Sequence, residues 1–287
     1  MIQADNLSIR DIVRQEVARL GPAADLNHID VSQVTDFYCL FSSLDWDGDI
    51  SRWDTSNATS MVRTFGESRF NGDISKWNTS KVWNLCATFA KSAFTGDISL
   101  WDTSNVVNLS ETFKYSDFTG DISGWDTGKV LTMASLFEGN TKFQGVLSSW
   151  NVSRVEDFRD CFRGAFYCGD ISSWNMKATS NKENMLRTIY LNSRIQLPRS
   201  TTYDDLVCMC GHQKMSARSY LHQQPELTLA HLEYALRVKK KPIWMPQDVY
   251  DHALSIRSMG ISLGLETKEI AQGLLNEIVF KAPPPMN

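Results

Sequence analysis

One six-residue pattern, Gly-Asp-Ile-Ser-x-Trp, returns along this chain at a nearly constant interval of 24 residues. It occurs in full five times, and a sixth copy reads Gly-Val-Leu-Ser-Ser-Trp. Because a segment of this length cannot bury an apolar stripe alone, the repeat predicts turns that stack and share one continuous core. One copy carries a single-residue insertion, and the six copies end at Trp53, Trp77, Trp101, Trp125, Trp150 and Trp174.

Apolar residues stand at the fifth, eighth and twelfth positions after each of the first five tryptophans, and the twelfth is always Phe. This spacing is that of one helical face, so the pattern predicts a short helix in each turn, preceded by a capping triplet such as Thr-Ser-Asn. The Asp-Ile-Ser segment is predicted to be a strand that pairs in parallel with the next turn. Strand–helix–strand crossovers are almost always right-handed. We therefore expect an α/β repeat, a right-handed solenoid of about six 24-residue turns.

The segment before the repeats is predicted to cap the solenoid. Ser8 and Asp11 fit a helix N-cap and a carboxylate three residues later, and Gly21-Pro22 ends the helix. An open solenoid end exposes its core, so a cap is required for solubility. Residues 1–28 are therefore assigned as an N-terminal capping helix, with an apolar stripe formed by Ile9, Ile12, Val13, Val17 and Leu20.

The repeat decays after Trp174, which ends the predicted solenoid domain of residues 29–185. Residues 186–287 are expected to be a transition segment and a C-terminal helical domain, with helices at about 226–240, 246–260 and 266–280. Three such helices form a marginal independent domain. We expect them to pack on the last turn or on a second copy of the chain.

The string Phe-x-Gly-Asp-Ile-Ser-x-Trp-Asp-Thr-Ser-x-Val-x-x-Met/Leu resembles the BspA-type leucine-rich-repeat family of bacterial surface protein repeats, over about residues 29–176. The resemblance implies a leucine-rich-repeat-like solenoid used for adhesion or protein contacts, without a shared catalytic motif. Many members are secreted, whereas this chain begins without the basic and apolar regions of a secretory signal. Signal-less members are similar to proteins carried by bacteria and their phages.

Net charge bears on the class of partner, and cysteine spacing bears on the compartment. A net charge of −4 argues against nucleic acid and anionic lipid as partners. The six cysteines show no regular spacing, which favours reduced thiols and a cytoplasmic location. No sequence signature of a cofactor is found. A protein is the expected partner, and a homodimer through the C-terminal helices is a second expectation.

Three groups of residues invite a chemical interpretation. The column of repeated aspartates, Asp49, Asp73, Asp97, Asp121 and Asp170, is either a cation site or, in our preferred interpretation, bonded locally to backbone N–H groups. Cys208-x-Cys210-x-His212 has zinc-ligand chemistry, and His222, His231 or His252 could supply a fourth ligand, but the cysteine spacing is not the usual one, so no metal site is assigned. Lys239, Lys240 and Lys241 either contact an acidic partner or complement the dipole of the helix that they end.

The sixth position after each tryptophan is predicted to lie beside the face that enters the core. It holds Trp83, Val107 and Leu131 in three successive turns, with Thr before them and Glu after them. An exposed apolar stripe of this kind marks a contact site, unless another segment of the chain covers it. We select these three residues, together with the three lysines, as candidate partner-binding residues.

The sequence thus predicts a non-catalytic scaffold that binds a protein partner through exposed solenoid positions. The family resemblance suggests one form of this function, an intracellular inhibitor of a host enzyme or defence system that a phage or bacterium encodes. The first alternative is a cell-surface or virion adhesion module. The second is an enzyme with its site in the C-terminal helical region.

Overall fold

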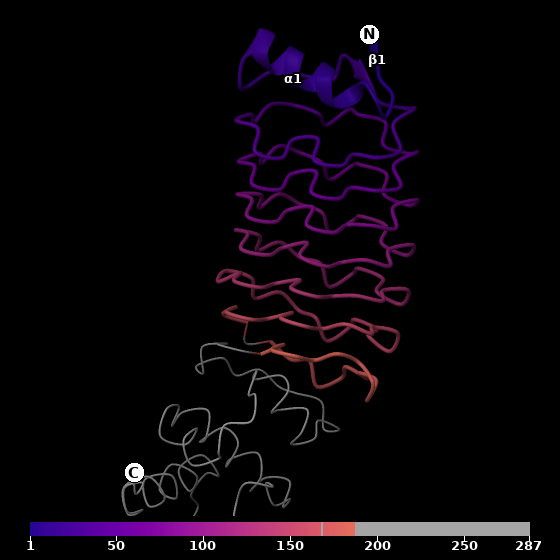
Figure 1. Cartoon of the computed structure of the whole chain (residues 1–287), viewed down its shortest axis with the longest axis vertical. Coiled ribbons are helices and arrows are strands. Elements are labelled where there is room, and N and C mark those ends of the chain that lie inside the picture. Colours follow the sequence, from indigo (N-terminus) through magenta and orange to yellow (C-terminus); the bar gives the residue numbers. More distant parts are fainter. Residues whose placement is uncertain (168, 187–287) are drawn as a thin grey trace, which may run out of the picture. The chain divides into compact units, whose positions relative to one another are not determined.

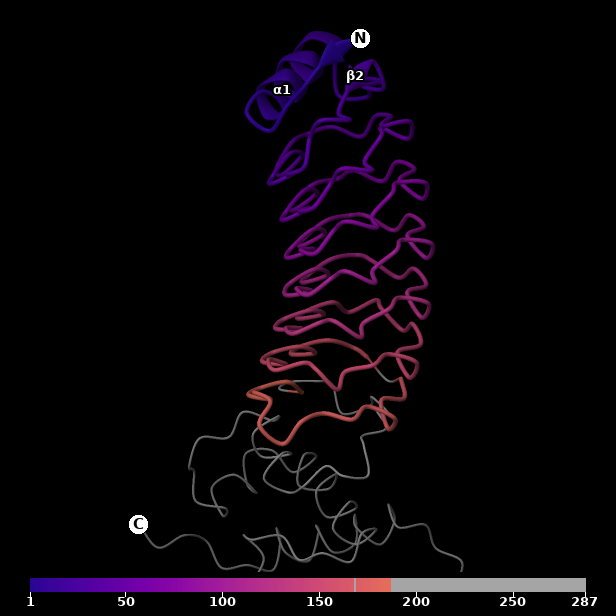
Figure 2. The same ribbon diagram turned by 90° about the vertical axis from the view of Figure 1, so that its right-hand side faces the viewer.

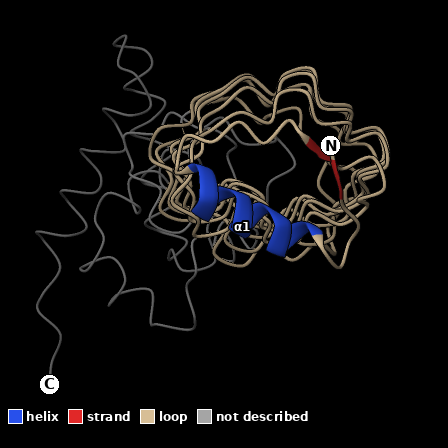
Figure 3. Ribbon diagram, turned by 90° about the horizontal axis from the view of Figure 1, so that it is seen from above, coloured by secondary structure: helices blue, strands red, loops and turns tan. Residues whose placement is uncertain are grey.

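The computed structural model describes residues 1–167 and 169–186, which form a stack of turns (Figures 1 and 2). The described elements are β1 (Ile2–Gln3), α1 (Ile9–Leu20) and β2 (Ile29–Asp30), in that order. After β2 the chain winds through successive turns that lie almost on top of one another when seen from above (Figure 3). The sequence repeat is therefore a repeat in structure.

Backbone pairing between turns occurs at the sixth and seventh positions after each tryptophan. The N–H of Trp83 donates to the Thr59 carbonyl at 3.0 Å, and the N–H of Val107 donates to the Trp83 carbonyl at 2.9 Å. Parallel bridges join the seventh positions of all neighbouring turns, namely Asp36, Ser60, Asn84, Asn108, Thr132, Asp157 and Asn181. The predicted strand at Asp-Ile-Ser does not form at Asp73, Asp97 or Asp121, which make no bridge among the described residues, whereas Asp49 bridges Asp25 and Asp170 also lies in a bridge.

The short helix expected inside each turn is also absent from residues 31–167 and 169–186. A left-handed residue interrupts the segment where it was predicted, for example Ala87 with φ 54°, and a second one follows it, for example Lys91 with φ 55°. A left-handed residue ends a right-handed helical run. The N–H groups instead bond across turns, as from Phe89 to the Thr112 carbonyl at 3.0 Å. The α component of the predicted α/β repeat is therefore wrong for the described turns.

The predicted inward-facing residues do form the core, which consists of aromatic columns. The phenylalanines at the twelfth position stack in register, with ring centroids 5.6 Å apart between Phe65 and Phe89 and 5.9 Å apart between Phe89 and Phe113. A second column runs beside it, in which Phe94 and Phe118 are 6.4 Å apart. All five rings are fully buried. Offset stacking of this kind stabilises a core beyond the burial of its area.

The invariant tryptophan has a polar function as well as an apolar one. The indole Nε1 of Trp101 donates to the Ile74 carbonyl of the preceding turn at 3.1 Å, and Trp125 donates to Ile98 in the same way at 3.1 Å. Equivalent bonds are made by Trp53, Trp77, Trp150 and Trp174. A buried backbone carbonyl needs such a partner. This need explains why Trp, and not Phe, recurs at this position.

The N-terminal segment completes the first turn. β1 pairs in parallel with β2. The side-chain oxygen of Asn6 accepts the N–H groups of Thr35 at 2.8 Å and Asp36 at 3.1 Å. In later turns these N–H groups bond to the backbone carbonyl of the turn before, as Thr59 and Ser60 do with Thr35. The Asn6 carboxamide therefore takes the place of a missing preceding turn.

Helix α1 lies over the first turn, at the N-terminal end of the stack (Figures 1 and 2). Its cap differs from the prediction by one helical turn. The Asp5 carboxylate accepts the N–H of Ser8 at 2.8 Å, and the Ser8 hydroxyl oxygen accepts the N–H of Asp5 at 3.0 Å, which is a reciprocal capping box. Gly21, with φ 92°, ends the helix as expected. Most of the predicted apolar stripe faces the stack, but Leu20 is 45% exposed.

Candidate partner-binding surface

The predicted stripe of Trp83, Val107 and Leu131 exists on the surface of the stack. The Trp83 side chain is 48% exposed, Leu131 is 36% exposed, and Val107 between them is half-buried. Their backbones are directly bonded, because the N–H of Leu131 donates to the Val107 carbonyl at 2.9 Å and that of Val107 to the Trp83 carbonyl at 2.9 Å. The structure thus places three apolar side chains in register on neighbouring turns.

A column that holds Lys in two of the three stripe turns, which the sequence analysis missed, lies two residues before the stripe. The Nζ atom of Lys81 donates to the Asn57 side-chain oxygen at 2.7 Å, and Lys129 donates to Asn105 in the same way at 2.6 Å. Arg154 continues this column. Among the described residues none of these three cations forms an ion pair with a carboxylate. Lys81 and Lys129 thus have neutral acceptors in hydrogen-bond contact, while Asp54 and Asp102 lie near enough for a weaker electrostatic attraction.

The asparagines that hold the two lysines are themselves fixed. The Asn57 side-chain amide donates to the Ser32 carbonyl at 2.8 Å, and the Asn105 amide donates to the Ser80 carbonyl at 2.7 Å. Each Asn therefore bridges two turns and presents its oxygen to the next Lys. This arrangement positions an ammonium group at alternate turns beside the apolar stripe.

The aspartate column confirms the preferred interpretation of local hydrogen bonding. The carboxylate of Asp73 accepts the N–H of Ser75 at 2.9 Å, and Asp97 accepts that of Ser99 at 2.9 Å. These bonds to the following serine hold the pKa of each of the two carboxyls below its ordinary value. Within the described ranges, no group of three His, Cys, Asp or Glu side chains is arranged to hold a metal ion.

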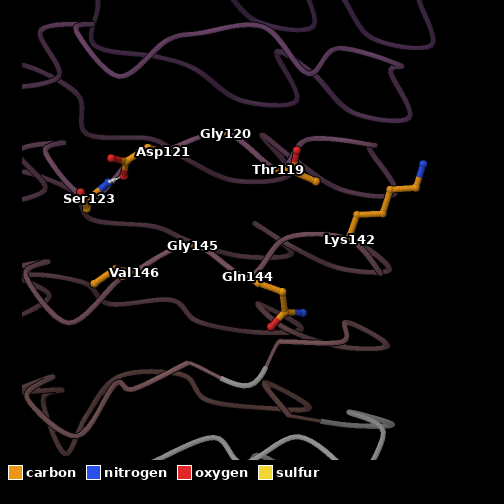
Figure 4. A pocket seen from close by; sticks show the side chains of 8 residues that line it. All are labelled: Thr119, Gly120, Asp121, Ser123, Lys142, Gln144, Gly145 and Val146. Atoms are coloured by element: carbon orange, nitrogen blue, oxygen red, sulfur yellow. Dashed lines mark hydrogen bonds between the residues drawn. The ribbon is translucent and has the colours of Figure 1, made fainter.

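The aspartate column is interrupted near the end of the copy that carries the single-residue insertion. Val146, 60% exposed, stands there in place of Asp and lines an open pocket of about 380 Å³ (Figure 4). Lys142 pairs with Asp117 at 2.7 Å, and the Asp121 carboxylate accepts the Ser123 N–H at 2.9 Å. The polar groups of the pocket therefore bond to their own neighbours and do not converge on one point.

A charged cluster surrounds Glu138, a buried carboxylate near the end of the described turns. Glu138 is buried, and its carboxylate lies 3.0 Å from Lys114 Nζ and 3.8 Å from Arg163 Nη1 and accepts a bond from the Tyr115 hydroxyl at 3.3 Å. Burial opposes the ionisation of Glu138, but hydrogen bonds from Ser135 and Lys114 hold the pKa of its carboxyl below the ordinary value. These groups satisfy one another, so the cluster is structural.

Asp160 lies beside this cluster, and the pKa of its carboxyl is shifted in the opposite direction to that of Glu138. Its Oδ1 atom is buried and accepts no hydrogen bond, although Arg163 Nη1 is 3.5 Å away. Burial raises the pKa of Asp160, and the charge of Glu138 contributes to the rise. Asp160 also has a left-handed backbone, with φ 57°, which Asn tolerates well.

We expect Glu138→Gln to destabilise the fold by about 1–3 kcal/mol at neutral pH, because the charged donors around it lose their carboxylate. Since the pKa of Glu138 is lowered by folding, its contribution is complete above the unfolded value of about 4.3 and is lost as pH falls through the folded value. Urea melts should show the difference from the parent shrinking below about pH 4. Asp160→Asn is the control with the opposite sign and should raise stability at neutral pH. Equal effects of Glu138→Gln at all pH values would contradict this account.

The remaining sequence predictions concern residues that the structure does not describe. Lys239, Lys240, Lys241 and the Cys208–His212 segment lie outside the described residues, as do the segments predicted to form the three C-terminal helices. Within the part that is described, no helix is both long and apolar enough to cross a membrane.

Comparison with known proteins places the repeat region in a family. No curated protein and no solved structure matches the chain. One family model matches residues 13–116 and, in a second overlapping match, residues 84–197. The two matches together span the stacked turns and more than half of the 287 residues. The chain therefore belongs to the repeat-containing family described as Mycoplasma protein of unknown function, DUF285.

Proposed function

We propose that this protein is a non-catalytic scaffold that binds a protein partner through the stripe of Trp83, Val107 and Leu131. The observation that carries the proposal is the register of the stripe. Three exposed or half-exposed apolar side chains occupy one position of three neighbouring turns, where the flanking turns carry Thr59 and Glu156. A binding site that extends over several repeats is the usual way in which stacked-repeat proteins recognise their ligands.

The proposal includes the fold class. Parallel bridges between turns and a shared aromatic core support a right-handed solenoid related to the BspA-type leucine-rich repeats. The polar groups outside the stripe support a binding function over a catalytic one. The aspartates of the column recur from turn to turn and are bonded to their own serines, whereas an active site occurs once.

The stripe proposal predicts that Leu131→Asp and Trp83→Ala weaken partner binding without unfolding the protein. A buried aromatic anchor commonly contributes about 2 kcal/mol or more, so Trp83→Ala should lower affinity by about 30-fold. The partner is first captured from the native host by affinity purification and identified by mass spectrometry. Titration calorimetry then compares the variants with the parent chain.

The matched control for Leu131→Asp is Leu100→Asp, because Leu100 is an 82% exposed leucine at a different position of the turn. Leu100→Asp should bind as the parent does. Thermal melts confirm that all three variants keep the parental unfolding midpoint. Unchanged affinity in both stripe variants, or an equal loss in Leu100→Asp, would exclude the stripe as the interface.

A further inference from the structure

The spacing of the stripe selects the kind of segment that can lie along it. Neighbouring paired turns are about 4.8 Å apart, so Trp83 and Leu131 are separated by about 10 Å along the stack. An α-helix that runs parallel to the stack advances about 5.4 Å per turn and accumulates a mismatch of only about 1 Å over this length. In an extended strand the residues on one face repeat at about 6.7 Å, and the mismatch reaches about 4 Å. A helix therefore matches all three turns.

The charges beside the stripe indicate which charged residues a bound helix should carry. Lys81 and Lys129 lie two turns apart, and each is held by a neutral carboxamide at 2.7 Å and 2.6 Å. Their separation of about 10 Å equals seven residues of an α-helix. Carboxylates on one flank of a bound helix would pair with both ammonium groups, whereas basic residues there would be repelled.

The other side of the stripe carries no matching column of charge. Three residues after the stripe, the turns present Cys86, Ser110 and Ala134, which are all half-buried. These side chains are small and uncharged. They therefore do not obstruct a bound helix and need no charged residue opposite them. The two flanks therefore differ, and the difference fixes the side on which the acidic residues of the helix must lie.

We propose that the partner presents an amphipathic helix aligned with the stack, with an apolar face over Trp83, Val107 and Leu131. Two carboxylates seven residues apart on one flank of this helix pair with Lys81 and Lys129. The apolar residues of such a helix recur at positions i, i+4 and i+7. This inference rests on the proposed function, because it specifies the partner of the same stripe.

The test uses the full chain and two designed helical peptides of about 16 residues. Both peptides carry Leu at positions i, i+4 and i+7, and one carries two Glu seven residues apart where the other carries two Lys. We expect the acidic peptide to bind about tenfold more tightly than the basic one, since two exposed charge pairs contribute about 0.2–1 kcal/mol each and the basic peptide is repelled. In the double variant K81E/K129E this preference should reverse.

The possible outcomes separate the two proposals. Equal affinity for both peptides, or a preference that does not reverse in K81E/K129E, would overturn the acidic helix. If neither peptide binds at millimolar concentration while Trp83→Ala still abolishes capture of the native partner, the helix is wrong and the stripe remains the interface. If Trp83→Ala leaves capture intact, both proposals fail. Should K81E/K129E not fold, the pair Lys81→Gln and Lys129→Gln must reduce the preference for the acidic peptide.

Discussion

Phe113→Ala is expected to destabilise the protein by about 3–5 kcal/mol, because it removes a large ring from the centre of a column that cannot close around the cavity. Phe113 is fully buried. Its ring stacks on Phe89 at 5.9 Å and Phe137 at 5.5 Å in the neighbouring turns, and on Phe118 at 4.3 Å in its own turn. The hydrogen-bonded backbones above and below prevent the turns from moving together.

The measurement is the free energy of unfolding in urea or guanidinium, compared with the control Leu100→Ala. Leu100 is also a large apolar residue, but it is 82% exposed, so its truncation should change stability by no more than about 0.5 kcal/mol. Glu111→Ala, at a partly exposed position two residues before Phe113, is a second control. Comparable losses in Phe113→Ala and the two controls would refute the assignment of the core.

The sequence predicted the interior of the turns correctly and their backbone incorrectly, and one cause explains both. A spacing of three and four residues is shared by a helical face and by a turn that bends twice and returns to the core. The bends are made by left-handed residues such as Ala87, Glu111 and Tyr115. Non-glycine residues rarely adopt this conformation and carry no sequence signal for it. The pattern therefore identified which side chains are buried, but not the backbone conformation that places them in the core.

The absence of the predicted strand from the central turns has no cause that is visible in the sequence. Asp97 accepts the N–H of Ser99 in a local turn. Within the ladder, Asn84 accepts the N–H of Cys86 in the same way at 3.0 Å, so this local bond does not decide which segment pairs. Only the structure shows that the bridges between turns lie at the seventh position, where Asn84 stands.

The two halves of the candidate site differed in how far the sequence predicted them. The apolar stripe was predicted because a hydrophobic residue is conspicuous at a position that is Thr or Glu in other turns. The lysine column was missed because Asn and Lys alternate there, so the period is two turns, from Lys81 to Lys129. Only the structure shows that each Lys reaches across to the Asn of the preceding turn.

Deletion of residues 1–22 should convert the protein into an aggregating species. The deletion removes α1, whose Ile9, Val13 and Val17 are buried against the first turn. Burial of such side chains contributes about 1.5–3 kcal/mol each, so the three together rival the whole stability of a typical domain, about 5–15 kcal/mol. The deletion also removes Asn6 and leaves the N–H of Thr35 without an acceptor from the chain. Size-exclusion chromatography with light scattering should show high-mass species.

Point variants distinguish the contribution of the buried apolar residues of α1 from that of the Asn6 carboxamide. Asn6→Ala removes only the carboxamide and should destabilise a soluble monomer by about 1–3 kcal/mol, because two backbone N–H groups lose their acceptor. Asn6→Asp keeps that acceptor and should lose less, since only the amide donor to the Thr35 hydroxyl is removed and the hydroxyl can itself donate to a carboxylate. Val13→Asp places a charge under α1 and should aggregate as the deletion does. A truncated chain that stays monodisperse and melts at the parental temperature would show that α1 does not cap the stack, because an uncovered aromatic core cannot remain stable in water.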